Sequence, residues 1–144
     1  MEKRSENRED KFEIPSKTLQ DIKTQTKNHP LKWRRFSIEQ INFALRTSPS
    51  RDDSGDQNGQ PAEYIHQPNE VAIYIWEDLP EKIQRVLLFH EIIEVYLRQT
   101  YGLDKTPAHT ITLTYEDQFR KEILSDKEEK ALKELRDRYS EKLK

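Results

Sequence analysis

The sequence predicts a small α+β domain, and three observations support this fold class. The first is "EKIQRVLLFHEIIEVYLRQTY", which follows Pro80, carries apolar residues at helical spacing and stops at Gly102. The second is "EVAIYIW", residues 70–76, whose β-branched and aromatic side chains are typical of a strand. The third is the scarcity of other strand signals. We therefore expect a short β-sheet packed against helices.

The N-terminal part of the sequence carries weaker signals of secondary structure. Residues 1–15 are almost wholly charged or polar, so we expect a disordered tail. The segment "SKTLQDIKTQTK", residues 16–27, is a candidate helix that begins with a serine cap and is ended by the "NHP" that follows it. Because this helix has few apolar side chains, its packing is not specified by the sequence.

A second helix is expected from Ile38 to about Arg46. Ser37 and Gln40 have the spacing of a capping box, and Ile38, Ile41 and Leu45 fall on one helical stripe. The following segment, residues 47–63, is rich in Gly, Pro and charged residues, which predicts a long flexible loop. The short "YIH" after this loop is a candidate hairpin partner for the 70–76 strand.

Two further helices are expected after Gly102. One begins near Thr106 or Pro107 and carries "AHTITLTYEDQFRKEIL" to Leu124. The other, residues 125–144, begins with a capping box of Ser125 and Glu128 and is charged on most sides. Its narrow apolar stripe consists of Ala131, Leu132, Leu135, Tyr139 and Leu143. Such a helix could bind a protein partner through a coiled-coil seam, or could lie over the domain.

Composition limits the classes of function. The chain has no cysteine, so any metal would be held by histidine and carboxylate, and a reducing, cytoplasmic location is expected. No apolar run approaches the length of a membrane-spanning helix, so we expect no membrane partner. The net charge of -2 gives no general attraction to nucleic acid. The motif "LKWRRF", residues 31–36, is too short to predict such a partner, and we expect Trp33 and Phe36 to pack against the core.

The long helix contains the candidate site, because it places charged groups among apolar residues. His90 and Glu94 are four residues apart, so their side chains lie one turn apart on the same face and could converge on one ion. An unpaired carboxylate among isoleucine and leucine is costly, and a bound cation would remove most of that cost. The sequence therefore predicts a metal site, with zinc as the expected ion.

A catalytic zinc typically has three protein ligands. Among the other histidines, only His109 lies at the start of the next predicted helix, where an antiparallel helical pair would bring it back toward His90. Glu116 is seven residues later on the same face, and we expect it to orient a histidine rather than to serve as a fourth ligand. Glu91 follows the first ligand directly, where it could act as general base and pass a proton to a leaving amine.

These residues resemble a known family, the zincin metallopeptidases, particularly their small intracellular members. The resemblance covers residues 70–124 and consists of the "NEVAIYIW" strand, the helix with "HEIIE", and the downstream "AH" and "YED". It implies a zincin-like domain over residues 16–124, a peptide or protein substrate that binds along the strand Val71 to Trp76, one zinc ion, and hydrolysis of peptide bonds. By the same resemblance His90, Glu94 and His109 are the ligands and Glu91 is the base.

One position departs from that family, because most zincins have histidine where this chain has Glu94. A glutamate there makes the site more negative and the activated water less acidic. A non-catalytic alternative therefore stays open, in which the same cluster is a structural polar network or a four-ligand structural zinc site in an interaction or regulatory protein.

Two rival metal enzymes fit the sequence less well. Helical nucleotide pyrophosphohydrolases pair Glu-x-x-Glu motifs, but the residue three positions after Glu116 is Phe119. A di-iron helical bundle needs Glu-x-x-His on each of two helices, and none of the predicted helices of this chain contains this motif.

Overall fold

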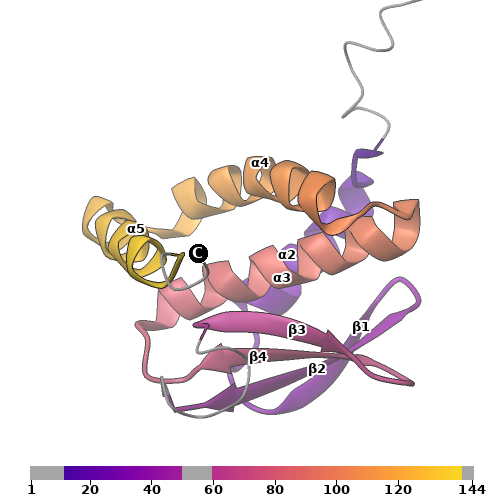
Figure 1. Cartoon of the computed structure of the whole chain (residues 1–144), viewed down its shortest axis with the longest axis horizontal. Helices are drawn as coiled ribbons and strands as arrows, with labels where there is room; N and C mark the ends of the chain where they lie inside the picture. Colours follow the sequence, from indigo (N-terminus) through magenta and orange to yellow (C-terminus); the bar gives the residue numbers. More distant parts are fainter. Residues whose placement is uncertain (1–11, 50–59, 141–144) are drawn as a thin grey trace, which may run out of the picture.

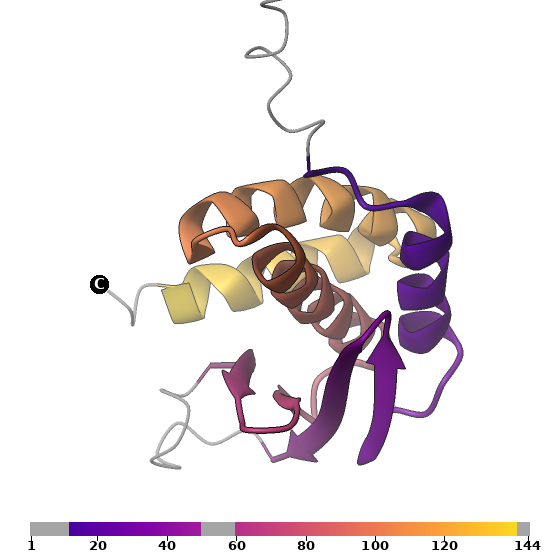
Figure 2. The same ribbon diagram turned by 90° about the vertical axis from the view of Figure 1, so that its right-hand side faces the viewer.

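A β-sheet and two successive layers of helix make up the part of the chain that the structure describes (Figure 1). The computed structural model describes residues 12–49 and 60–140. In these ranges the elements are, in order, α2 (Ser16–Lys27), β1 (Arg34–Ile38), β2 (Ile41–Ser48), β3 (Ala62–His66), β4 (Val71–Trp76), α3 (Glu81–Tyr101), α4 (Lys105–Ile123) and α5 (Asp126–Ser140). α3 lies between the sheet and α4, and α2 lies beside α3 (Figure 2). The expected α+β class is confirmed.

The sheet has the strand order β1-β2-β4-β3. β1 and β2 are antiparallel, β2 and β4 are parallel, and β3 returns antiparallel to β4. The strand expected at residues 70–76 is confirmed as β4, and the "YIH" segment forms most of β3, its hairpin partner. β4 is an inner strand, whereas β3 and β1 lie at the two edges of the described sheet.

The prediction of a helix from Ile38 to about Arg46 is wrong, because this segment forms the turn and second strand of the β1–β2 hairpin instead. The two-residue turn contains no Gly, Asn or Asp, and Glu39 takes the left-handed conformation, with φ of 58°, that glycine usually supplies. The local sequence thus lacks the usual signal for a hairpin. Parallel pairing of Phe43–Ser48 with Val71–Trp76 supplies backbone hydrogen bonds from a distant segment, and no local pattern reports this pairing.

Two other segments depart from the expected boundaries. Strand β2 extends to Ser48 and β3 begins at Ala62, so both ends of the expected loop 47–63 are strand. Most of the remaining loop lies outside the described residues, as does the expected tail up to residue 11. Within that tail's expected range, Ile14 is buried, and its backbone N–H donates to the hydroxyl of Tyr115 at 2.8 Å.

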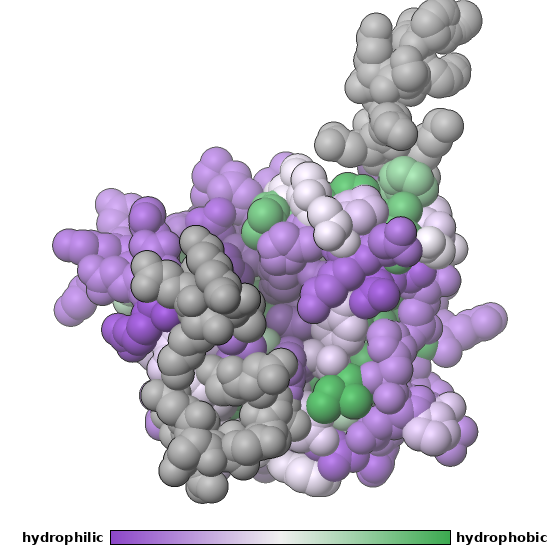
Figure 3. All heavy atoms as spheres, viewed as in Figure 1, coloured by the Kyte–Doolittle hydropathy of each residue, from purple (hydrophilic) through white to green (hydrophobic). Residues whose placement is uncertain are grey.

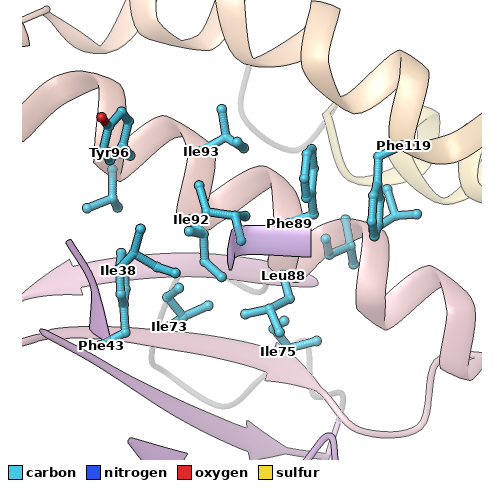
Figure 4. Close-up of a cluster of buried hydrophobic side chains, with 14 of the residues drawn as sticks. Ile38, Phe43, Ile73, Ile75, Leu88, Phe89, Ile92, Ile93, Tyr96 and Phe119 are labelled. Atoms are coloured by element: carbon cyan, nitrogen blue, oxygen red, sulfur yellow. The ribbon is translucent and has the colours of Figure 1, made fainter. Parts of the chain in front are cut away.

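The core lies between α3 and the sheet and continues between α3 and α4 (Figure 4). Ile73 and Ile75 of β4 face Leu88 and Ile92 of α3, and all four side chains are fully buried. On the other side of α3, the rings of Phe89 and Phe119 stack with centroids 4.1 Å apart. Because α3 is covered on two faces, its polar residues at positions 90 and 94 must find partners inside the protein.

Helices α3 and α4 form an antiparallel pair, which the sequence predicts. α3 ends where Gly102 adopts a left-handed conformation with φ of 69°, the expected glycine cap. α4 then starts at Lys105 and runs back along α3, close to the expected start at Thr106 or Pro107. The helix expected at residues 16–27 is also confirmed as α2, although Pro15 rather than a serine takes the cap position and no side chain caps it.

Helix α5 begins with the predicted capping box. The Ser125 backbone N–H donates to Glu128 Oε1 at 2.8 Å, and the Glu128 N–H donates to Ser125 Oγ at 3.2 Å. Leu132 and Leu135 are buried, and the Tyr139 ring packs edge-on against Trp76 with centroids 5.1 Å apart. These three residues of the apolar stripe therefore pack on the domain, which is the second of the two expected arrangements, whereas Ala131 is exposed and Leu143 lies outside the described residues.

The described surface is mainly hydrophilic in the view of Figure 3. Its exposed large apolar side chains are Trp33, Ile65 and Leu113. Packing of Trp33 against the core was expected and is wrong, since its side chain is 61% exposed and carries the Arg46 guanidinium 4.6 Å from its ring centre. Phe36 does pack, stacked on Phe43. Among the described helices, none has the length and apolar character needed to cross a membrane.

Candidate metal centre

Three predicted ligands come together between α3 and α4. His90 and Glu94 project from one face of α3, and His109 projects from the first turns of α4. Each offers one ligand atom, and these atoms all lie within 4.8 Å of one another. His90 Nε2 is 3.4 Å from Glu94 Oε1, and His109 Nδ1 is 3.2 Å from the same oxygen. Two imidazoles and a carboxylate form a donor set that suits zinc.

His90 is held by a carboxylate from the opposite helix. Its Nδ1 donates to Glu116 Oε1 at 2.7 Å, and both side chains are buried. This bond fixes the ring and directs Nε2 toward Glu94 and His109. A histidine ligand commonly has such a carboxylate on its second nitrogen, where the carboxylate sets the tautomer and the basicity of the ring. The position of Glu116 fits the orienting role that the sequence favoured for it.

Two arginines surround Glu116. Arg136 of α5 donates from Nη1 to Oε2 at 2.7 Å and from Nη2 to Oε1 at 2.8 Å, which is a bidentate pair. Arg120, one turn later on α4, places Nε 2.9 Å from Oε2. With His90 included, both oxygens of Glu116 have at least two partners. This carboxylate therefore has no free oxygen to offer a metal in the arrangement described.

Glu94 has a different kind of partner. Its side chain is 2% exposed, and Oε2 accepts a hydrogen bond from the hydroxyl of Tyr64 at 2.7 Å. Tyr64 stands on β3, and its hydroxyl oxygen accepts in turn from Arg98 Nη1 at 2.9 Å. Oε1 faces the two histidines. One oxygen of Glu94 is thus anchored to the sheet and the other points into the candidate metal centre.

A pocket of about 320 Å³ opens beside these residues. Its wall includes His90, Glu91 and His109, and its other lining residues are Gln60, Pro61, Ala62, Leu87, Leu113, Arg136 and Tyr139. His109 is 49% exposed, whereas His90 is 8% exposed, so the centre is reached from the His109 side. Glu91 shares this pocket with two of the three candidate ligands, which is the location that a general base requires.

The charges of the cluster depend on one another. Burial alone lowers the pKa of His90, but hydrogen bonds to Glu116 and Glu94 outweigh it and raise the pKa to about 9. Burial also favours the neutral form of Glu116, yet its bonds with His90 and Arg136 lower its pKa to about 2. Without a metal, His90 is therefore an imidazolium between two carboxylates at neutral pH.

The pKa values of Glu94 and Glu91 are shifted in opposite directions, because the two carboxylates have different partners. Burial would raise the pKa of Glu94, but hydrogen bonds from His109, His90 and Tyr64 hold it well below its usual range. No donor of this kind contacts Glu91 within residues 12–49 and 60–140, and burial raises its pKa to about 7, although the charge of His90 opposes this shift. Burial likewise raises the pKa of Tyr64 well above its usual range, so its hydroxyl stays protonated.

Three of the residues that support the site were not predicted from the sequence. Arg98 lies four residues after Glu94, so helical spacing could have identified it. Arg136 lies four residues after Leu132, on the apolar stripe of α5, where a charged residue signals a buried partner. Tyr64 had no such signal, because it is thirty residues from Glu94 and reaches it through the sheet.

The sheet topology contradicts the expectation that an extended peptide binds along the strand Val71–Trp76. Val71–Trp76, as β4, is hydrogen-bonded to β2 on one side and to β3 on the other, so it offers no free edge. β3 (Ala62–His66) is the edge strand on the site's side, and its first residue lines the pocket. Any strand addition would therefore use β3.

Comparisons with protein-family models, with curated proteins and with solved structures each find no match. The geometry of the site is accordingly the basis for the functional inference.

Proposed function

We propose that the protein is a zinc-dependent peptide hydrolase with a zincin-like domain, in which His90, Glu94 and His109 hold the metal. The observation that carries this proposal is the convergence of these three side chains, with their ligand atoms within 4.8 Å, beside a pocket that Glu91 also lines. A nitrogen-rich set of three ligands with access from solvent is the arrangement of catalytic zinc sites.

The residues present fit a zinc ion by their chemistry. The set supplies two neutral nitrogens and one negative oxygen once His90 Nε2 has lost its proton, and Glu116 retains the hydrogen bond to Nδ1. A zinc ion in this position would polarise a carbonyl group and increase the acidity of water. Glu94 in place of a histidine adds negative charge, which lowers that acidity relative to a three-histidine set.

The proposed roles of the protein's own residues follow from their places in the pocket. Glu91 takes a proton from the attacking water and delivers it to the leaving amine. Strand β3, at the edge of the described sheet, binds the substrate chain in extended form by strand addition, which leaves the scissile bond near His109. Leu87 and Leu113 offer apolar contact to a substrate side chain. The substrate class is therefore an extended peptide or an unfolded segment of a protein.

The test compares zinc content and cleavage in matched variants. Protein purified without chelators or a histidine tag is expected to hold one zinc per chain by elemental mass spectrometry, and to cleave an unfolded protein substrate. Glu91→Gln should keep the zinc and lose on the order of 100-fold or more in cleavage rate. Glu81→Gln is the control, because this exposed glutamate lies on the same helix and pairs with Arg85. Full activity in Glu91→Gln, with zinc retained, would refute the role of Glu91.

A non-catalytic interaction protein is the second candidate, and one observation favours it. All four oxygens of Glu94 and Glu116 already have protein partners, so the cluster can exist as a structural polar network without a metal. A parent protein that takes up no zinc, even after incubation with the ion, would favour this candidate. The four-ligand structural zinc site is less well supported, because the arginines occupy Glu116.

A further inference from the structure

We propose that Tyr64, supported by Arg98, is a positioning residue that restricts Glu94 to binding the metal through one oxygen. This inference rests on the proposed function, since it takes His90, Glu94 and His109 as the metal ligands. It assigns a role to a residue of the sheet, outside the two helices that carry those ligands.

The two oxygens of Glu94 have separate environments. Oε2 receives the hydroxyl hydrogen of Tyr64 at 2.7 Å, on the side of the sheet. Oε1 lies 3.4 Å from His90 Nε2 and 3.2 Å from His109 Nδ1, on the side of the candidate metal centre. Because the side chain of Glu94 is 2% exposed, bulk solvent has almost no access to either oxygen. Tyr64 therefore determines which oxygen faces the histidines.

Arg98 fixes the direction of the hydrogen bond. A phenol hydroxyl has one hydrogen to donate and an oxygen that can accept. Arg98 has only donors, and its Nη1 lies 2.9 Å from the Tyr64 oxygen, so this contact uses the accepting side of the hydroxyl. The single hydroxyl hydrogen is thereby directed to Glu94. Arg98 also lies one turn after Glu94 on α3. The hydrogen bonds of Tyr64 on β3 therefore connect two residues on the same face of α3.

The consequence concerns the coordination of the metal. A carboxylate can bind a cation through one or both oxygens, and binding through both uses a position that substrate or water would otherwise take. An oxygen that already accepts a short hydrogen bond is a poorer ligand. Tyr64 would thus keep Glu94 in the one-oxygen mode. This constraint is specific to a glutamate ligand, because a histidine at the same position would present one nitrogen only.

The experiment measures metal binding in Tyr64→Phe, which removes the hydroxyl and keeps the ring. Zinc affinity is measured by competition with a coloured chelator, and the protein loaded with Co²⁺ is examined by visible absorption spectroscopy. Tyr74→Phe is the matched control, because Tyr74 lies on the neighbouring strand β4 and contacts Arg46 rather than the site. We expect a loss of zinc affinity of about 10- to 100-fold in Tyr64→Phe, and no change in the control.

The spectrum separates positioning from a general loss of stability. If Glu94 turns to bind through both oxygens, the Co²⁺ bands of Tyr64→Phe should weaken and shift, as expected for a higher coordination number. Arg98→Met, which keeps the hydroxyl, should show the same change to a smaller extent. This second variant also provides the test if Tyr64→Phe fails to fold.

The outcomes distinguish this inference from the proposed function. Metal binding by the parent with an unchanged affinity and spectrum in Tyr64→Phe would overturn the role of Tyr64 and leave the metal site standing. Weaker binding with an unchanged spectrum would also overturn it, since the hydroxyl would then contribute stability without setting the coordination. A parent that binds neither Zn²⁺ nor Co²⁺ would overturn the proposed function and this inference together.

Discussion

Two buried carboxylates on facing helices, Glu94 on α3 and Glu116 on α4, show how partners decide what the same side chain can do. Glu116 is 0% exposed and is surrounded by cationic groups, namely hydrogen-bonded Arg136 and His90 and the Arg120 guanidinium, which forms an ion pair with it. Glu94 is 2% exposed, and its partners are one neutral hydroxyl and two histidines. The first carboxylate is saturated by cations, and the second still faces groups that can coordinate a metal.

The difference assigns complementary roles to the two ends of the cluster. At the Glu116 end, the charge is balanced within the protein, so this residue can hold His90 firmly without taking part in coordination. At the Glu94 end, no arginine contacts the carboxylate directly among the described residues, so a bound cation would supply the positive charge there once His90 has lost its Nε2 proton. A site of this kind needs both ends, one for orientation and one for the metal.

The largest expected effect comes from neutralising each carboxylate in turn. Glu94→Gln should reduce zinc affinity on the order of 100-fold or more, because it replaces a charged ligand with a neutral amide. Glu116→Gln should reduce it by about 10-fold, since it replaces the charged acceptor of the His90 Nδ1–H with a neutral amide and leaves the ligands in place. Zinc titration in competition with a chelator measures both. Equal losses in the two variants would remove the distinction between ligand and orienting residue.

The pH dependence of the metal-free protein tests the shared histidine. The pKa of His90 is raised to about 9 from an ordinary 6.5. Its contribution to stability is therefore complete below pH 6.5 and is lost as the pH rises through 9, a change on the order of 3 kcal/mol. Chemical denaturation at several pH values, with a chelator present, measures it.

A control separates His90 from its neighbour in that experiment. The pKa of Glu91 is raised to about 7 from 4.5, so its titration lowers the stability of the protein only between pH 4.5 and pH 7. The slope above pH 7 therefore belongs to His90. His90→Gln should therefore flatten the curve between pH 7 and 9. A parent curve without any slope in this range would show that His90 is neutral in the metal-free protein.

A smaller effect is expected from the arginine that α5 supplies. Arg136→Met should lower the free energy of unfolding by about 2 kcal/mol, because Glu116 would keep its buried charge and retain only Arg120 and His90. Arg138→Met, an exposed arginine on the same helix, is the matched control and should change stability by less than about 0.5 kcal/mol. Equal values for the two variants would mean that Glu116 does not depend on α5.

The smallest expected effect concerns the N-terminal cap of α5. Ser125→Ala removes the oxygen that accepts from the Glu128 backbone N–H and should cost about 1 kcal/mol of stability. Although α5 presents Arg136 to Glu116, this arginine lies in the second half of the helix, so fraying of the first turn should leave zinc affinity nearly unchanged and shift only the unfolding midpoint. A zinc affinity that falls as far as in Glu116→Gln would show that the cap controls the site itself.

The sequence predicted the helical part of the site well, and the reason is local. Residues four apart on a helix must share a face, so His90 and Glu94 could be paired from their numbers alone. Gly102 marked the end of α3, and the short connection required α4 to return along it, which brought His109 and Glu116 to His90. The α+β class, the β4 strand and the capping box of α5 followed from similarly local patterns.

The tertiary structure decided what depends on distant segments. The residues from Ile38 to Arg46 carry a helical stripe, yet pairing of β2 with β4 makes them strands, because hydrogen bonds to a distant segment outweigh a weak local preference. The same sheet makes β3 the edge strand and brings Tyr64 to Glu94. By itself, the sequence determined which helix faces carry the histidines and carboxylates. Folding determined the donors that meet each carboxylate, since those donors come from other elements of the chain.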